Sequence, residues 1–499
     1  MQIVFGKPCC IAVLLLFTGL AFAQAPVVSI PSVSGPVPVT ATSFPFLAAQ
    51  RNLTPMDLGK SGYTEEEFII SGNANVYDWG SDGSVTVKTA NAPYATRILV
   101  RRPDNGARFS GNVIVEILHS GRRFDWPMIW GYSHEHFIES GDAWVGITMP
   151  NSIAGLKTFN PARYSALSFA NPSKTPCTAN AAVSEIEEGL RWDAISQVAA
   201  LLKTSSAQLL GSGRTAQAVL LTMQGGEIQT YINAIHSRAV LANGKPAYDG
   251  YLVKSPAASV RINQCAAAPP ANDSRRVIRK TNVPVIAVVA QGEVIDAQPF
   301  ARSDSDAADD KFRVYEIAGA GHIDKMAYTG FALLPDQTAA VGSAQGTADW
   351  PFNVTCEPPI PMMAVPAMTY ALDAAFANLK EWVRKGTPAP RAARIETGAA
   401  PSGVAVVLDT HGNGLGGVRN PYVDVPAATL FTNSNGPGVC REMGREAAFD
   451  AMQFQSLYPS AKVYADKVAQ VADRLVKERW LTEPDARKIK QQARARSSK

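Results

Sequence analysis

Three residue types that act together in acyl transfer each follow an apolar, strand-like run of this sequence. Thr222 ends the run QAVLLT, Glu293 follows NVPVIAVVA, and His322 follows FRVYEIAG. A hydroxyl is a weak nucleophile until a base takes its proton, and His322 could act as that base. A carboxylate on the other imidazole nitrogen fixes the tautomer and stabilises the imidazolium. The order hydroxyl, carboxylate, imidazole therefore predicts a triad, with Asp296 as the reserve for the acid.

A further group of candidate residues follows the apolar run GNVIVEIL. His119, Ser120 and Gly121 come directly after this run, and Trp126 and Trp130 lie shortly beyond it. In open parallel sheets, ligands bind at the carboxyl ends of the strands, so this loop should face the same cleft as the triad. His119 could orient or polarise a substrate, although a structural role explains it equally well. The tryptophans suggest an apolar or aromatic substrate.

Two other polar clusters resemble metal sites but are not expected to be any. His134 and His136 flank Glu135, yet the i, i+2 spacing puts the two histidines on different faces of a helix. Asp304 and Asp306 belong to the run SDSDAADD, which is typical of a solvated acidic loop. The sequence has no P-loop and no G-x-G-x-x-G after a strand, so we expect neither a cofactor nor a metal.

The elements that must position these residues alternate along the chain. Apolar runs at 111–118, 143–150, 282–290 and 312–319, together with QAVLLT, are typical of strands buried on both faces. Apolar residues recur at helical spacing over 185–204. Strands that alternate with helices predict an α/β fold with a mostly parallel central sheet flanked by helices.

The pattern changes on both sides of this region. Residues 24–110 form an extended lead-in followed by β-like runs, and residues 111–330 form the predicted α/β core with insertions. Residues 331–499 are rich in loops and contain two amphipathic helical stretches, 367–386 and 461–493. We expect this last part to pack on the core.

Composition excludes several classes of protein. Of the 499 residues, 46% are hydrophobic and 18% are charged, which is typical of a globular protein rather than a disordered one. The formal net charge is only +4, and no basic stripe with interleaved aromatic residues is present. Nucleic acid is therefore not an expected partner.

The N-terminus has the features of an export signal. Lys7 precedes the apolar run IAVLLLFTGLAFA, which ends in a small-x-small pattern, so we expect a signal peptide over residues 1–23 with cleavage after Ala23. The apolar run is short for a transmembrane span, although a retained anchor is the alternative. We expect an exported protein, periplasmic or extracellular, that does not stay inserted in a membrane.

Four cysteines would remain after cleavage, namely Cys177, Cys265, Cys356 and Cys440. An even number in an exported chain permits two disulfides, and three pairings are open. The alternative is four buried free thiols. None of the four has the C-x-x-C spacing that is typical of zinc sites.

Most of the mature chain resembles a known family, the bacterial exported alpha/beta hydrolase domain proteins. The resemblance rests on APYATRILVRRP, FSGNVIVEIL, EGLRWDAISQVAALLK, TYINAIH, KPAYDGYLV, VRINQC, FRVYEIAGAGH and GLGGVRNPYVDVPAA, in this order, and on a helix near the end that carries LYP. It implies an α/β-hydrolase fold and hydrolysis of an ester-type bond in a small molecule. It also implies that Glu293 is the acid and His322 the base.

The resemblance places the nucleophile in the stretch LLTMQGG. The family pattern Gly-x-Ser-Gln-Ser/Thr-Gly-Gly, laid without gaps on residues 220–226, puts Thr222 on the first serine. A shift of one residue would put Met223 there, with Gln224 on the family's glutamine. The first register implies an oxyanion hole made by the N–H of Met223 and an N–H of the 120–121 loop. Gln224 is then a candidate substrate-binding residue.

Two hypotheses about function follow. In the first, Thr222 attacks an ester, His322 acts as general base and then acid, and Glu293 orients it. In the second, the chain is a non-catalytic ligand-binding protein on a hydrolase scaffold, which the substituted turn favours.

Overall fold

The computed structural model describes residues 1–2, 27–256, 260–271, 273–343, 354–357, 359–401, 403–436 and 438–497. Residues 3–23 of the predicted signal segment, with Cys9, Cys10 and the cleavage point after Ala23, lie outside the described residues. Among the residues that are described, no helix is both long and apolar enough to cross a membrane.

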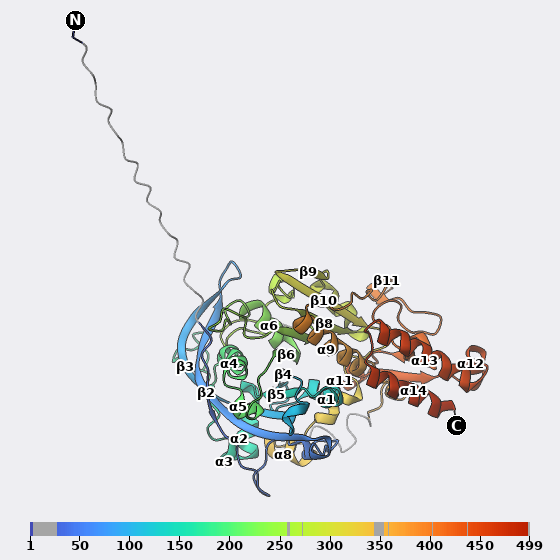
Figure 1. The fold of residues 1–499 in the computed structure, drawn as a ribbon, viewed down its shortest axis with the longest axis horizontal. Helices are drawn as coiled ribbons and strands as arrows, with labels where there is room; N and C mark the ends of the chain where they lie inside the picture. Colours follow the sequence, from blue (N-terminus) through green and yellow to red (C-terminus); the bar gives the residue numbers. More distant parts are fainter. Residues whose placement is uncertain are drawn as a thin grey trace.

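One large sheet organises the described part of the chain (Figure 1). Its strand order is β1-β2-β3-β5-β4-β6-β7-β8-β10-β9. The strands are β1 (Ser32–Ser34), β2 (Tyr63–Trp79), β3 (Val85–Pro103), β4 (Asn112–Ile117), β5 (Ala143–Ile147), β6 (Ala218–Gln224), β7 (Gly250–Lys254), β8 (Val285–Ala290), β9 (Ser305–Ala307) and β10 (Asp310–Ile317). The central neighbours from β5 to β10 are parallel, and the outer pairings are antiparallel. The predicted fold class is confirmed.

The helices and two small sheets complete the fold. The helices are α1 (Met128–Ser140), α2 (Ile153–Phe159), α3 (Pro161–Tyr164), α4 (Arg191–Thr204), α5 (Ala207–Leu210), α6 (Gly226–Ala234), α7 (Val294–Ala297), α8 (Leu334–Val341), α9 (Ala367–Lys385), α10 (Pro421–Asp424), α11 (Gly438–Glu442), α12 (Ala451–Leu457), α13 (Ala461–Lys477) and α14 (Glu483–Ser497). The small sheets pair β11 (Thr397–Ala400) with β12 (Gly403–Val406), and β13 (Ala428–Phe431) with β14 (Arg445–Ala448). In Figure 1, β2 and β3 arch around one side, and α12 to α14 lie at the opposite side.

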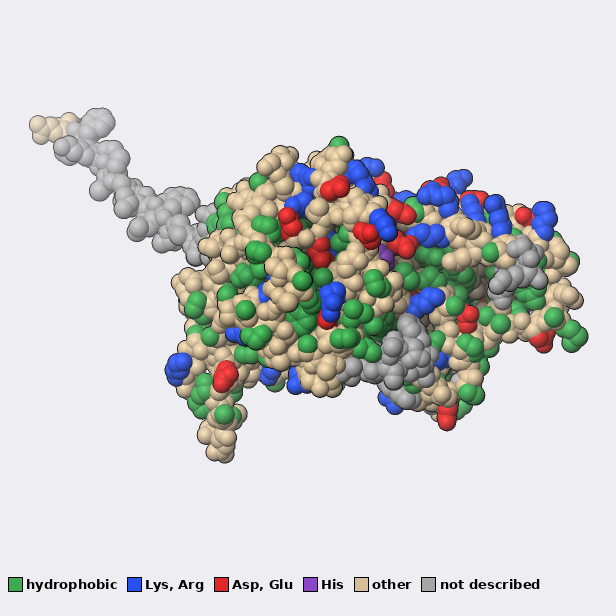
Figure 2. All heavy atoms as spheres, turned by 90° about the horizontal axis from the view of Figure 1, so that it is seen from below, with side chains coloured by type: hydrophobic (Ala, Val, Ile, Leu, Met, Phe, Trp, Pro, Cys, Tyr) green, Lys and Arg blue, Asp and Glu red, His purple; other side chains and the backbone are tan. Residues whose placement is uncertain are grey.

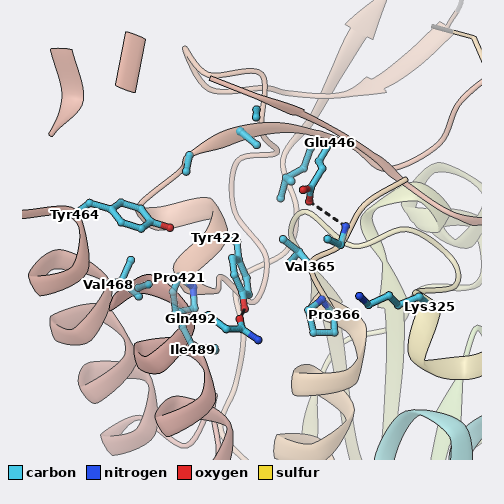
Figure 3. Close-up of a pocket in the computed structure, with 16 residues that line it drawn as sticks. Lys325, Val365, Pro366, Pro421, Tyr422, Glu446, Tyr464, Val468, Ile489 and Gln492 are labelled. Atoms are coloured by element: carbon cyan, nitrogen blue, oxygen red, sulfur yellow. Dashed lines mark hydrogen bonds between the residues drawn. The ribbon is translucent and has the colours of Figure 1, made fainter. Parts of the chain in front are cut away.

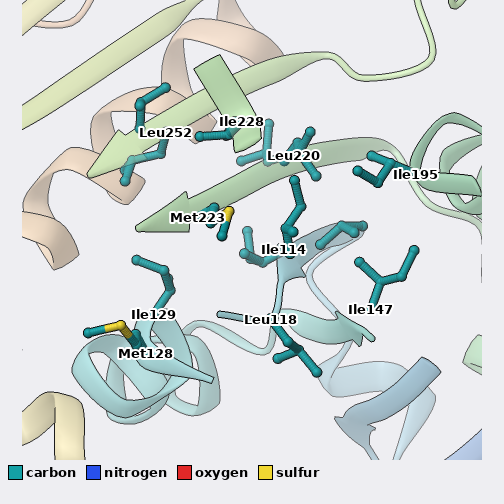
Figure 4. Packing of buried hydrophobic residues seen from close by; sticks show 14 of the residues in the cluster. Ile114, Leu118, Met128, Ile129, Ile147, Ile195, Leu220, Met223, Ile228 and Leu252 are labelled. Carbon is teal, nitrogen blue, oxygen red and sulfur yellow. The ribbon is translucent and has the colours of Figure 1, made fainter. Parts of the chain in front are cut away.

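The core forms around the central strands because their residues are apolar without alternation. Every residue of β4, β5, β6, β7 and β8 is buried, as expected for parallel strands covered on both faces. Around β6, side chains from β4 and from α1, α4 and α6 meet those of the strand (Figure 4). α13 and α14 pack on one another through a smaller cluster of their own that includes Val468, Leu475 and Ile489.

Three elements differ from the sequence-based expectation. The β-like runs before residue 103 join into two long strands, β2 and β3, which pair along their whole length. The stretch GYLVK forms β7, which the sequence analysis did not assign. The strand begun by QAVLLT does not end at Thr222 but continues to Gln224, because Met223 and Gln224 stay paired with Val253 and Lys254.

Two disulfides join the four cysteines. Cys177 is bonded to Cys265, and Cys356 is bonded to Cys440. The second bond fastens the segment before α9 to α11, close to the residues that flank the histidine loop described below.

A buried ionic network fastens β2 and β3 to the core. The Glu67 carboxylate accepts hydrogen bonds from Arg97 and Arg163 and, at 2.8 Å, from the Tyr164 hydroxyl. Arg97 also donates to Asp125 at 3.1 Å. These charged side chains of Glu67, Arg97, Arg163 and Asp125 are fully buried, so each depends on the others for compensation.

We therefore expect Glu67→Gln to lower the free energy of unfolding by about 3–5 kcal/mol, because it leaves buried arginines uncompensated. Urea denaturation followed by tryptophan fluorescence measures this. The exposed pair of Lys462 and Asp466 provides the control, since Asp466→Asn should cost far less. Equal losses in the two variants would contradict the importance of this network.

Candidate active site

His322 lies in the loop that follows β10. Small residues are needed there, because a Cβ added at Gly321 would come within 2.6 Å of the Gly444 backbone nitrogen. The loop is held by backbone pairing of Ile323 with Met443, and the Ile323 N–H donates to the Glu442 carbonyl at 2.8 Å. The His322 side chain remains 28% exposed, so a small molecule can reach it. In the view of Figure 2, histidine is visible only as a small patch, with charged side chains beside it and hydrophobic side chains nearby.

The structure brings Glu293 and His322 together. Glu293 ends a short 3-10 helix directly after β8, and its Oε1 lies 2.5 Å from His322 Nδ1. Its Oε2 accepts the Ala290 N–H at 2.9 Å, which fixes the carboxylate against the end of its own strand. We assign the hydrogen of the imidazole to Nδ1, because a carboxylate only accepts hydrogen bonds at this distance. Nε2 therefore carries the lone pair of the neutral ring.

The side chain that contacts His322 Nε2 is that of Gln224 and not a hydroxyl. The Gln224 Nε2 lies 3.2 Å from His322 Nε2, and the amide donates because the ring nitrogen accepts. Gln224 is the last residue of β6, Gly225 turns the chain with φ of 130°, and α6 begins at Gly226. A side chain other than glycine would be strained at that φ. The apex of the turn between β6 and α6 is therefore Gln224.

The prediction that Thr222 occupies the apex is wrong. Thr222 is fully buried inside β6, between Glu116 of β4 and Leu252 of β7 in the sheet register. Its Oγ1 has no hydrogen-bond partner among the described residues. Met223 is also an interior residue of the strand, so its N–H does not follow the apex. The residue that does is Gly225, whose N–H donates to the Lys254 carbonyl at 3.2 Å.

The family pattern contained a signal for this position. When the pattern is laid on residues 220–226, Gln224 falls on the Ser/Thr that directly precedes the two glycines. Only a glycine can readily take the φ of Gly225, so the sharp turn lies beside the glycines rather than two residues before them. If the position of the turn is inferred from the two glycines, Gln224 is predicted at its apex.

Two further residues at the site were not found from the sequence. Lys254 ends β7, is fully buried, and places its Nζ 3.4 Å from Glu293 Oε2 and 2.6 Å from Ser255 Oγ. Ser255 Oγ lies 3.4 Å from His322 Nδ1, and its backbone has a left-handed φ of 58°. The sequence contained one indication of these residues: Lys254 and Ser255 are polar and stand at the end of the apolar stretch GYLVK.

Charge compensation sets the ionisation of this cluster. Burial would raise the pKa of Glu293, but the ammonium of Lys254 and the hydrogen bond from His322 outweigh it and hold that pKa well below its ordinary value. Burial lowers the pKa of Lys254, and Glu293 acts in the opposite direction. The carboxylate is therefore the ionised partner that orients His322.

The loop after β4 places His119 where its ring is influenced electrostatically by His322. Burial lowers the pKa of His119, Glu227 raises it, and the charges of Arg122 and His322 lower it further. Its backbone exchanges hydrogen bonds of 3.0 Å with Trp126, and the two rings meet edge to face.

Ser120 and Gly121 of the same loop were predicted to contribute an N–H group to the oxyanion hole. Ser120 is buried, whereas Gly121 is exposed and directs its N–H to His119 Nδ1 at 3.4 Å. Both follow β4, the neighbour of β6 in the sheet. The loop therefore lies at the same edge of the sheet as Gln224.

Trp130 does not lie in the site, whereas Tyr132 does. Trp130 is fully buried, with Arg101 over its ring and Trp144 beside it. On the same helix, the Tyr132 hydroxyl lies 3.5 Å from both Gln224 Oε1 and the His322 carbonyl. Helix α1 is oriented by Glu116, whose carboxylate accepts the N–H groups of its first turn.

The remaining polar candidates lie elsewhere. His134 Nδ1 faces backbone carbonyls of its own helix, and His136 Nε2 contacts the Lys380 ammonium at 3.0 Å. Asp306 pairs with arginines, and Asp296 is exposed on α7. Within the described ranges, no group of three or more His, Cys, Asp or Glu side chains is arranged to hold a metal ion.

The lowered pKa of Glu293 predicts a pH-dependent stability. A carboxyl whose pKa is lower in the folded than in the unfolded state stabilises the fold above its ordinary pKa of 4.5, and this contribution is lost as the pH falls. We expect wild type to be more stable than Glu293→Gln at pH 7, with the difference shrinking between pH about 4.5 and pH about 3.

Urea denaturation at fixed pH values measures this difference. Asp296→Asn removes an exposed carboxylate from the adjacent helix and should show a much smaller difference at neutral pH. A gap between wild type and Glu293→Gln that stays constant down to pH 3 would contradict this account.

Comparison with known proteins identifies the family of the chain. A family model described as "Alpha/beta hydrolase domain" matches residues 33–491. No curated protein matches the chain. Among solved structures, esterase Est22 is 14% identical and covers 58% of this chain and 80% of its own, with a TM-score of 0.29. A putative dienelactone hydrolase from Klebsiella pneumoniae subsp. pneumoniae is 15% identical and covers 55% and 95%, with a TM-score of 0.25. An esterase B from Lactobacillus rhamnosis is 11% identical and covers 50% and 74%, with a TM-score of 0.26. The family match spans most of the sequence, and the chain therefore belongs to the alpha/beta hydrolase domain family.

Proposed function

We propose that this protein hydrolyses an ester-type bond of a small molecule by direct attack of water, with His322 as the base. The observation that carries the proposal is the Glu293–His322 pair, which has the orienting hydrogen bond of 2.5 Å on Nδ1 and a lone pair on Nε2. An imidazole held in this way presents Nε2 to take a proton from water.

Water is the nucleophile because, among the described residues, no hydroxyl contacts His322 Nε2: the Ser255 hydroxyl lies on the Nδ1 side of the ring, 3.4 Å from Nδ1, and accepts a hydrogen bond from Lys254. Gln224 stands at the apex, and a carboxamide is not among the side chains that form acyl intermediates. The Thr222 hydroxyl is buried within the sheet. The reaction is therefore a single displacement without an acyl-enzyme.

The protons balance without a cofactor. His322 Nε2 takes a proton from water as the water oxygen bonds to the acyl carbon. The tetrahedral intermediate then expels the alcohol oxygen, to which His322 returns the proton, leaving acid and alcohol. Glu293 stays ionised throughout and stabilises the imidazolium that forms between the two steps.

In this mechanism, Gln224 orients the attacking water. A glutamine amide can orient an attacking water through its oxygen and nitrogen, as it does in GTP hydrolysis. The N-terminus of α6 begins just after Gly225, so its partial positive charge lies near the developing oxyanion. The loop of Ser120 and Gly121 borders the same edge and supplies the other wall of the oxyanion site.

Several features suggest the substrate and the compartment. The rings of His119 and Trp126 border the loop beside the site, which suits an apolar or aromatic group on the ester. The N-terminal signal pattern and the two disulfides are compatible with export to the periplasm or beyond. Nucleic acid is not part of this proposal.

One observation favours a second function, that of a non-catalytic ligand-binding protein. The Gln224 amide occupies the Nε2 lone pair that a base must use. In this second function, Gln224 fixes the His322 ring as a wall of a binding site. The two functions differ in whether the wild-type protein turns over an ester.

Hydrolysis of p-nitrophenyl esters distinguishes these functions. We expect turnover by wild type without a burst, and a loss of about 10²–10⁴-fold in kcat/KM in His322→Ala, because general-base catalysis contributes on this order. Thr222→Val keeps the packing and removes the hydroxyl, so it should leave the activity unchanged. If activity fell as far in Thr222→Val as in His322→Ala, the threonine would be the nucleophile after all.

Gln224→Ser is the complementary variant. It places a hydroxyl beside His322 and should produce both a burst of p-nitrophenol and covalent labelling by a fluorophosphonate, whereas wild type should not be labelled. An inactive wild type together with an active Gln224→Ser would establish the ligand-binding function instead. Labelling of wild type would refute the water mechanism.

A further inference from the structure

A cavity whose lining includes neither Gln224 nor His322 lies between the C-terminal helices and the small β13–β14 sheet (Figure 3). Its volume is about 330 Å³. Small-molecule pockets span roughly 300–1,000 Å³, so this cavity is large enough for a compact ligand.

Most of the residues that line the cavity are apolar. Val468 of α13, Ile489 of α14 and Leu430 of β13 are almost fully buried and line it, together with prolines and alanines. The aromatic rings of Tyr422 and Tyr464 add further apolar surface. This wall suits a hydrocarbon or aryl group, because each apolar contact there removes surface from water.

The few polar side chains at the cavity differ in whether they already have a hydrogen-bond partner. Lys325 is exposed and has no hydrogen bond or ion pair with any described residue. The carboxylate of Glu446, in contrast, accepts the Ala364 N–H at 3.1 Å (Figure 3). The amide oxygen of Gln492 accepts the Tyr422 hydroxyl at 2.9 Å. The cavity therefore presents two charges, and the Lys325 ammonium is the one whose hydrogen-bond donors are all open to a ligand, whereas the Glu446 carboxylate is already engaged by a backbone N–H.

We propose that this cavity binds a small amphipathic carboxylate, with its anionic end at Lys325 and its apolar body against α13 and α14. A charge-assisted hydrogen bond to the ammonium supplies specificity, and burial of the apolar body supplies most of the affinity. The site is independent of the proposed hydrolysis and stands whether or not His322 acts as a base.

The walls of the cavity are joined to the histidine loop. Lys325 opens the 3-10 helix Lys325–Gly330, three residues after His322. β14 follows Met443, which pairs with Ile323 in the same loop. The ligand would therefore contact the segment that follows His322 and not the imidazole itself.

Isothermal titration with three probes of equal chain length tests the chemistry. Octanoate, octylammonium and 1-octanol share an apolar body and differ in charge. We expect octanoate to bind most tightly, and its affinity to fall with added salt because the ion pair is partly exposed. Tighter binding of octylammonium than octanoate would overturn the proposal and point to Glu446 as the recognition group.

Two substitutions locate the site, each with a matched control. Lys325→Met keeps the apolar stem and should weaken octanoate about tenfold while leaving octanol unchanged, and Lys280→Met removes another exposed lysine as its control. Ala448→Phe fills the cavity from a strand, where aromatic residues are well tolerated, and should abolish binding of both probes. Ala447→Phe, on the opposite face of β14, is its control.

The outcomes separate the proposal from simple misfolding. Circular dichroism and the melting temperature report whether each variant folds, and the two controls should bind octanoate like wild type. If octanoate binds equally well to wild type, Lys325→Met and Ala448→Phe, the cavity is not its site. If octanol binds as tightly as octanoate, the cavity is an apolar pocket without anion recognition, and the proposal fails.

Discussion

The candidate site depends on the hydrogen bond between Glu293 and His322, which in turn depends on the parallel pairing of β8 and β10. Ala290 and Ile317 are partners at the ends of these strands. The chain then needs only three residues to reach the acid and five to reach the imidazole. Because both strands run in the same direction, the two side chains emerge at the same edge of the sheet.

The same constraint explains why the apex of the turn is Gln224. β6 lies between β4 and β7, and its pairing with β7 continues to Lys254. A strand paired in this way cannot turn earlier without losing backbone hydrogen bonds in a dry interior, which is costly. The turn therefore occurs at Gly225, and Thr222 lies within the sheet.

Electrostatics then sets what the site can do. A carboxylate this deeply placed needs compensation, and Lys254 supplies it from the neighbouring strand. With Glu293 kept ionised, His322 has one defined tautomer and presents Nε2 to Gln224. The C-terminal part of the chain supports this geometry from outside the sheet, since Met443 pairs with the loop that carries His322.

The amino-acid pattern alone was enough to predict the fold class, the main strands, and the contact between the side chains of Glu293 and His322. These follow from local apolar runs and from the rule that strand ends meet at one edge. Only the tertiary structure decided the disulfide pairing, the partners Lys254 and Ser255, and which residue of TMQGG faces the imidazole. The reason is physical: a strand ends where its pairing with its neighbours ends, and β7 is distant in sequence from β6. The glycines marked the turn, but hydrogen bonds to another strand placed Gln224, and not Thr222, at its apex.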